Sequence, residues 1–213
     1  GLISLKSSGI KHFQDIKGKR IGYIGEFGEK IIDNLAQHAS ISKSEYQTVR
    51  VGMYMVDAII QDKVDAAIGF SNFHQIELEE KAGPASILRI DELANLGCCC
   101  FCSIHFITCD QHLEQNSELL KAFLFATQRA ATFVTQYPEE SYDILSAAHP
   151  WMKTSLNKKI FIHTLPLCSR NLLNIERDWN KVYKYTQHIS LHKGDLPLEQ
   201  CYTNSLIGKT HYN

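Results

Sequence analysis

The first ninety residues alternate short β-rich runs with helical patterns, and this alternation limits the possible folds more than any other feature. Strands are expected at residues 2–6, 19–24, 48–53, 64–69 and 86–90, with helical patterns at 30–36, 56–60 and 74–81. Strands that alternate with helices on short connections are typical of a mainly parallel sheet with helices on its faces. The sequence therefore predicts an α/β fold for this part of the chain.

The second half of the chain is mostly helical. Apolar residues recur at helical spacing from Ser117 to Gln136, Pro138 suits the first turn of another helix, and residues 156–165 and 175–189 follow the same period. A further strand is expected at residues 100–108. A chain that enters a lobe on one strand and leaves it on another is typical of a two-lobed binding protein. We therefore expect residues 1–108 to form an α/β lobe with its two hinge strands. Residues 109–213 would form the C-terminal helical part of the other lobe, covering a sheet whose strands come from other sequence.

Composition excludes several classes of partner. The formal net charge is −1 and the pI is near 6.9, so the chain has no basic footprint for nucleic acid or for a membrane surface. No apolar stretch approaches the roughly 20 residues that span a bilayer, and the start Gly1-Leu2-Ile3-Ser4 lacks the layout of a signal peptide. Seven cysteines, an odd number with four crowded together, argue against a secreted disulfide framework. Reduced thiols in the cytoplasm are the better interpretation.

A glycine pair lies between an expected strand and an expected helix, in Gly25-Glu26-Phe27-Gly28. Glycines there allow backbone N–H groups to point at a phosphate, and the positive end of the following helix adds to the attraction. The alternative is a tight strand-to-helix turn in which glycines only permit unusual dihedral angles. Spacing alone leaves both interpretations open.

Four cysteines crowd into five positions, at Cys98, Cys99, Cys100 and Cys102. Thiolates suit iron and zinc. On a regular strand, however, Cys99 faces away from the other three, and the spacing matches neither structural zinc sites nor iron–sulfur motifs. A redox-active metal site, reactive thiols and burial in a core all remain open. The histidines at 74, 105, 149 and 163 are scattered and fit surface or core positions.

Several segments resemble the fungal-type pyrimidine synthase family of thiamine biosynthesis, and the resemblance covers nearly the whole chain. They are residues 17–28, 62–69, 88–94, 96–102, 177–182 and 202–204, of which the Cys-Cys-Cys-Phe-Cys string is the most specific. The resemblance implies a two-lobed fold like that of periplasmic binding proteins (type II), and a homodimer. It further implies synthesis of 4-amino-5-hydroxymethyl-2-methylpyrimidine phosphate from pyridoxal phosphate and a histidine of the protein itself. That reaction requires iron and oxygen and consumes the protein in one turnover.

On this resemblance Gly25, Glu26, Phe27 and Gly28 hold the phosphate of pyridoxal phosphate, which is a substrate and not a cofactor. Cys98, Cys99, Cys100 and Cys102 form the iron-associated motif. The lysine and histidine that the family uses in the reaction match positions upstream of Gly1, so no catalytic residue is assigned, and we expect the chain to be a fragment that is inactive alone. Two alternatives stay open: the substrate-binding component of a transporter for a pyrimidine or thiamine precursor, and a truncated copy without activity.

Overall fold

The computed structural model describes residues 1–90, 104–192, 194 and 197–207. The chain divides into two compact units. The first comprises residues 1–99 and 184–193, and the second comprises residues 100–183 and 194–213.

The first unit contains a five-stranded sheet of order β3-β2-β4-β1-β5. The strands are β1 (Leu2–Leu5), β2 (Arg20–Tyr23), β3 (Gln47–Arg50), β4 (Ala66–Ile68) and β5 (Ala85–Leu88). Strand β2 pairs in parallel with β3 and β4, whereas β1 pairs antiparallel with β4 and β5. The predicted α/β fold is confirmed, and each strand expected in the first ninety residues is present.

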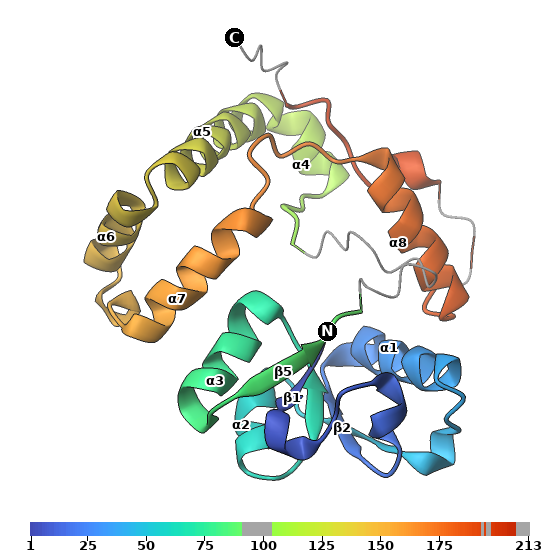
Figure 1. The fold of residues 1–213 in the computed structure, drawn as a ribbon. Coiled ribbons are helices and arrows are strands. Elements are labelled where there is room, and N and C mark those ends of the chain that lie inside the picture. Colours follow the sequence, from blue (N-terminus) through green and yellow to red (C-terminus); the bar gives the residue numbers. More distant parts are fainter. Residues whose placement is uncertain (91–103, 193, 195–196, 208–213) are drawn as a thin grey trace. The chain divides into compact units, whose positions relative to one another are not determined.

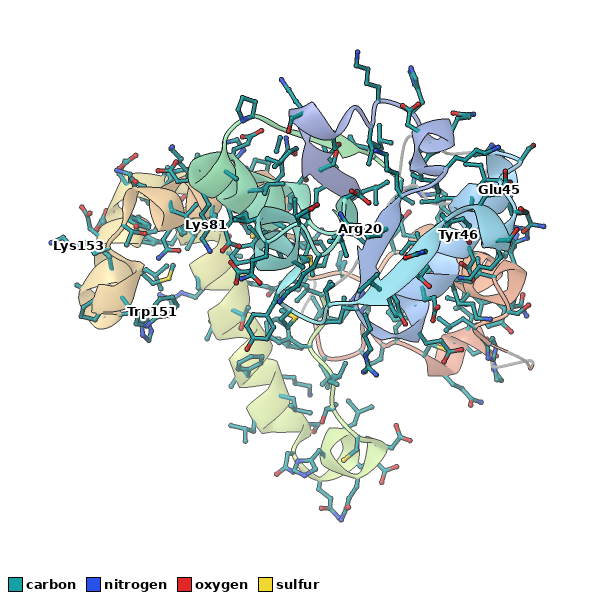
Figure 2. The ribbon with its side chains drawn as sticks, turned by 90° about the horizontal axis from the view of Figure 1, so that it is seen from below. Arg20, Glu45, Tyr46, Lys81, Trp151 and Lys153 are labelled. Atoms are coloured by element: carbon teal, nitrogen blue, oxygen red, sulfur yellow. The ribbon has the colours of Figure 1, made fainter. Side chains whose placement is uncertain are left out.

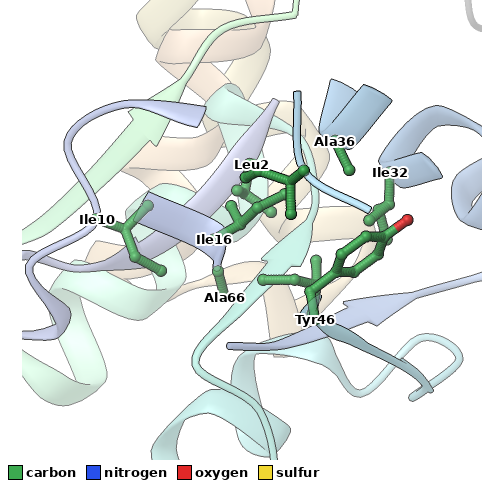
Figure 3. Close-up of a cluster of buried hydrophobic side chains, with 9 residues drawn as sticks. Leu2, Ile10, Ile16, Ile32, Ala36, Tyr46 and Ala66 are labelled. Atoms are coloured by element: carbon green, nitrogen blue, oxygen red, sulfur yellow. The ribbon is translucent and has the colours of Figure 1, made fainter. Parts of the chain in front are cut away.

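Helices cover both faces of this sheet (Figure 1). Helix α1 (Gly25–His38) packs on one face, and α2 (Met55–Ile60) and α3 (Ile76–Ala82) pack on the other. Because successive strand residues point to opposite faces, Leu2 and Ala66 belong to one core while their neighbours Ile3 and Ala67 belong to the other. The core beneath α1 contains Leu2, Ile10, Ile16, Ile21, Ile32, Ala36, Ile41, Tyr46 and Ala66 (Figure 3). The core beneath α2 and α3 contains Ile3, Met55, Val56, Ala58, Ile59, Val64, Ala67, Leu78 and Ala85.

The start of β2, at the edge opposite its carboxyl end, carries an ion-pair network. The guanidinium of Arg20, a residue labelled in Figure 2, lies 2.6 Å from the Asp62 carboxylate and 3.0 Å from that of Asp65. Arg20 lowers the pKa of Asp65, and the two carboxylates raise the pKa of Arg20. Arg20 thus links two acidic side chains and holds the start of β2 to the loop before β4.

The last turn of α8 (Glu176–His188) belongs to the first unit and contacts α1. The Tyr185 hydroxyl is buried and donates to Asn34 Oδ1 at 3.2 Å, and the Asn34 amide lies 3.2 Å from His188 Nε2. Since Asn34 lies in the middle of α1, these bonds help to hold the helix whose first turn contains the glycine pair.

The second unit is helical in the part that the structure describes. Its helices are α4 (Asp110–Gln115), α5 (Ser117–Gln136), α6 (Pro138–Ala148), α7 (Ser155–Thr164) and the first turns of α8. Pro138 occupies the first turn of α6 as expected. Thr154 caps α7 by accepting a hydrogen bond from the Asn157 amide.

One predicted element is wrong over its described part. The expected strand at 100–108 shows no regular secondary structure from residue 104 onward, and those residues are exposed. A strand requires a neighbour for its backbone hydrogen bonds, and none of the strands in the described residues pairs with this segment. Apolar residues such as Ile104 and Phe106 produced the strand pattern without providing that neighbour.

Candidate ligand-binding edge

Three loops of the first unit meet at one edge of the sheet. Strands β3, β2 and β4 are neighbours and run in parallel, so their carboxyl ends lie side by side. We call the loops that follow them the carboxyl edge: residues 24–28 after β2, 51–54 after β3 and 69–75 after β4. Ligands of open α/β sheets bind outside the carboxyl ends of the strands, which makes this edge the first place to look for a site.

The glycine pair lies on the central loop of the carboxyl edge, where β2 turns into α1. Gly25 has φ +64°, in the left-handed region that favours glycine, and Gly28 is buried in the first turn. Ile24 occupies the N-cap position and its side chain provides no capping hydrogen bond. The first N–H groups of a helix have no partner within the helix, and the helix dipole adds partial positive charge there. The turn is therefore built like an anion-binding helix start.

Glu26 and Phe27 lie in the same turn, between the two glycines. Glu26 is exposed and lies in the first turn of α1, where an acidic side chain is favourable to the helix dipole. Phe27 is half-buried. The structure thus brings the four predicted residues together in one turn, with the backbone as the group suited to a phosphate.

Large apolar side chains are exposed around the glycine turn. Exposed fractions are 40% for Ile24, 68% for Met53, 73% for Tyr54, 52% for Phe70 and 39% for Phe73. All five lie on the loops of the carboxyl edge, next to one another in strand order. Contiguous exposed apolar groups of this kind mark binding sites more often than ordinary surface. The combination of an anion-binding turn and an apolar rim favours a ligand with both a charged group and a ring.

His74 lies beneath this rim and is almost completely buried, at 3% exposure. It belongs to a π-helical turn, η4 (Ser71–Gln75), a conformation that often occurs at functional sites. Its Nδ1 accepts a hydrogen bond from the Phe70 N–H at 3.0 Å, so the neutral ring carries its proton on Nε2. Burial lowers the pKa of His74 and favours this neutral form. Within the part of the chain that the structure describes, the buried Nε2 has no hydrogen-bond partner.

The hydrogen bond between the Phe70 N–H and His74 Nδ1 could not be predicted from the sequence. His74 was expected at a surface or core position, and the structure places it in the core. Its hydrogen bond to Phe70 depends on a π turn, for which the sequence has no known signature. Two aromatic residues shortly after an expected strand, Phe70 and Phe73, are the signal that the sequence offers for this turn.

The predicted iron-associated residues, Cys98, Cys99, Cys100 and Cys102, lie outside the described residues. Of the cysteines within them, Cys109 and Cys168 are exposed and Cys201 is half-buried. Residues 1–90, 104–192, 194 and 197–207 contain no cluster of three or more His, Cys, Asp or Glu side chains placed to hold a metal ion. The predicted metal motif therefore stays a prediction.

A hollow of about 480 Å³ lies away from the carboxyl edge, beside the end of α1 and the loop that follows it. Its polar groups are matched: the Tyr46 hydroxyl donates to Asp33 at 2.7 Å, and Lys43 pairs with the same carboxylate. These three side chains therefore form an ion-pair and hydrogen-bond network among themselves on one wall of the hollow. No helix in the described part of the chain has the length and apolar character needed to cross a membrane.

Comparison with solved structures identifies the fold. The aliphatic sulphonate-binding protein SsuA from Escherichia coli matches with a TM-score of 0.64 and 15% identity, over 93% of this chain and 63% of that protein. The alkanesulfonate-binding protein SsuA from Xanthomonas axonopodis, bound to MOPS, matches with a TM-score of 0.65 and 13% identity, over 93% and 67%. At these identities the similarity establishes the fold alone, and the expected periplasmic-binding-protein-like fold is confirmed.

Sequence comparison identifies the family. A protein described as 4-amino-5-hydroxymethyl-2-methylpyrimidine phosphate synthase in Legionella pneumophila is 54% identical over 213 residues, which are all of this chain and 67% of that protein. A protein of the same description in Aspergillus parasiticus is 38% identical over 218 residues, covering 99% of this chain and 63% of that protein. The chain thus spans about two-thirds of the length of these relatives. The family model described as "NMT1/THI5 like" matches residues 1–141. The chain therefore belongs to the NMT1/THI5-like family, as the resemblance in its sequence predicted.

Proposed function

We propose that the protein containing this chain synthesises 4-amino-5-hydroxymethyl-2-methylpyrimidine phosphate for thiamine biosynthesis. Its substrates are pyridoxal phosphate and a histidine of its own chain, and the reaction uses iron and oxygen and consumes the protein in one turnover. The single observation that carries this proposal is the 54% identity to a synthase over all 213 residues. The carboxyl edge supports it independently, because an anion-binding turn beside an apolar rim suits a ring phosphate.

The chain's own residues would bind and orient this substrate. The backbone of residues 25–28 would hold the phosphate at the positive end of α1. The exposed apolar groups of the carboxyl edge would cover the ring and exclude water from it. The phosphate would thus fix one end of the molecule while the ring points along the rim.

Iron fits the donor set of the cysteine motif, because thiolates are suitable ligands for it. Cys98, Cys99, Cys100 and Cys102 would hold it. When bound, iron would supply one-electron and oxygen chemistry, which the twenty amino-acid side chains perform poorly. We further propose that the protein is a cytoplasmic homodimer.

The alternative function is a substrate-binding component of a transporter. The fold shared with SsuA proteins is the observation in its favour, at 13–15% identity. A fold by itself does not determine function, and the identity to the synthases is far higher. The two proposals differ in a direct way: a transport component binds its ligand and releases it unchanged.

The test is product formation by the full-length protein. Protein, pyridoxal phosphate, ferrous iron and air would be incubated, and the pyrimidine phosphate measured by mass spectrometry. We expect product from the wild type, and at least about tenfold less when Cys98, Cys99, Cys100 and Cys102 are replaced by Ser, because hydroxyl groups bind iron poorly compared with thiolates.

Cys168→Ser is the matched control, since Cys168 is an exposed cysteine far from the motif in sequence. It should form as much product as the wild type. Binding of pyridoxal phosphate without any product would support the transport component instead. Equal product from the wild type and the four-serine variant would reject the role of the cysteines.

A further inference from the structure

The turn after β4 places two phenyl rings against the imidazole of His74. The Phe70 ring stacks on the imidazole, with centroids 5.7 Å apart and an interplanar angle of 21°. The Phe73 ring meets it edge to face, at 4.7 Å and 84°. The imidazole lies in the core, while both phenyl rings are partly exposed on the carboxyl edge. His74 is thus the fixed ring against which the two exposed rings are placed.

Backbone contacts hold this turn in a single shape. The Phe70 carbonyl accepts hydrogen bonds from the amides of Phe73, His74 and Gln75, at 3.3, 2.9 and 3.3 Å. The Phe70 amide in turn donates to His74 Nδ1. A Cβ at Gly69 would lie 3.0 Å from Ile3 Cδ1 and 3.2 Å from His74 Cβ, so only glycine fits without displacement of its neighbours.

The turn that carries Phe70 and Phe73 is close to the anion-binding turn at residues 25–28. Strand β4 is the direct neighbour of β2, so the loop with Phe70 and Phe73 lies one strand away from Gly25. Neighbouring strands are about 4.8 Å apart. In pyridoxal phosphate, one methylene carbon and the ester oxygen separate the ring from the phosphorus. A phosphate at the glycine turn would therefore place an attached ring within reach of the neighbouring loop.

We propose that Phe70 and Phe73 form the contact surface for the aromatic ring of the substrate, and that His74 is the positioning residue that holds them. This inference deepens the proposed function and rests on it. The ligand class is a planar heteroaromatic ring carrying a phosphate. The glycine turn selects for the phosphate, and the two phenyl rings select for the ring.

The experiment separates the two parts of the ligand in the full-length protein. Pyridoxine 5′-phosphate is the ring-bearing probe, since its alcohol cannot form an imine with a lysine, and inorganic phosphate is the probe without a ring. Affinities would be measured by titration calorimetry for the wild type and for the Phe70→Leu and Phe73→Leu variants. We expect each variant to lower the affinity for pyridoxine phosphate roughly 2- to 12-fold, which corresponds to the energy of one aromatic pair. The affinity for inorganic phosphate should stay unchanged.

Variants of His74 test positioning as distinct from general stability. In His74→Asn the side-chain oxygen can still accept from the Phe70 amide, so the ratio of the two affinities should stay near the wild-type value. His74→Ala loses that acceptor and should lower the ratio as the Phe variants do. Phe125→Leu, which removes a phenyl ring that is 62% exposed on α5, is the control and should change neither affinity.

The outcomes distinguish this inference from the proposed function. The inference is overturned if the Phe70 and Phe73 variants lose affinity for both probes equally, or if they lose affinity for neither. It is also overturned if the wild type binds both probes equally well. If one of these results is found and the wild type still forms the pyrimidine product, the proposed function stands without the inference. A wild type that binds neither probe and forms no product overturns both.

Discussion

Replacing Gly25 by Ala tests whether the glycine turn binds a phosphate or is only a tight connection. Gly25 has φ +64°, and a Cβ there would meet no atom within 4 Å. The substitution therefore introduces backbone strain without a steric clash. Gly18 is the matched control, because it has φ +76° and a Cβ there would also meet no atom within 4 Å. Gly18 lies shortly before β2, whereas Gly25 lies shortly after it.

The expected loss of stability is similar for the two variants. A non-glycine residue in the left-handed region costs roughly 1–2 kcal/mol. For a domain of 150–250 residues, each kcal/mol lowers the melting temperature by about 2–4 °C. Both variants should therefore melt about 2–8 °C below the wild type.

Their effects on ligand binding should differ. Relief of the strain at position 25 would turn the first N–H groups of α1 away from a bound anion. A hydrogen bond to a charged group contributes roughly 1.5–3 kcal/mol, so the loss of one would weaken phosphate binding about 10- to 150-fold. At Gly18 the same strain lies at the other end of β2 and should leave the affinity unchanged.

The assay is titration of the full-length variants with inorganic phosphate and pyridoxine 5′-phosphate, together with a thermal melt of each. Wild-type affinity in Gly25→Ala would refute the phosphate role and support the interpretation as a simple turn. Equal loss of affinity in Gly18→Ala would show that strain anywhere along β2 is sufficient, which would also refute it.

Three further predictions concern stability, measured by urea unfolding. Leu78→Ala should lower the free energy of unfolding by roughly 2–5 kcal/mol, because Leu78 lies on the buried face of α3, in the core against the sheet; the exposed Leu119→Ala should change it by less than about 0.5 kcal/mol, and equal effects would contradict the core assignment. Tyr142→Phe should cost about 1–3 kcal/mol, since the buried hydroxyl donates to the carbonyls of residues 152 and 154, and a loss near zero would show that these bonds do not stabilise α6. Burial lowers the pKa of His74 in the folded state, against the opposing effect of Glu77. The unfolded chain therefore takes up a proton below about pH 6.5 that the folded chain does not, so stability should fall as the pH drops from 6.5 towards the folded pKa. His74→Asn should reduce that dependence, and an unchanged dependence would contradict the assignment of His74 as its source.

Local periodicity predicted the secondary structure well where each element makes its own pattern. The helix expected from Ser117 to Gln136 has those bounds, and the ends of the five strands of the first unit lie within three residues of their expected positions. Strand order was not predictable, since it depends on pairing between distant segments, such as β1 inserted antiparallel between β4 and β5. The short helix α4 also lacked a clear apolar stripe and was not foreseen.

The candidate site was predictable only in part, for the same physical reason. The glycine turn depends on residues adjacent in sequence, so the pattern at 25–28 was sufficient to find it. The apolar rim depends on three loops that become neighbours through sheet pairing. The role of His74 depends on one hydrogen bond in a π turn. Neither arrangement has a signature in the linear sequence.

The most direct test of the proposed synthase is the amount of product that each protein molecule makes. Full-length protein of known concentration would react with excess pyridoxal phosphate, ferrous iron and air, with the pyrimidine phosphate and the intact protein both measured by mass spectrometry. We predict that product stops at or below one molecule per protein chain, and that the reacted protein loses mass at one histidine. Continued turnover with an unchanged protein mass, or bound substrate recovered without any product, would contradict the proposal.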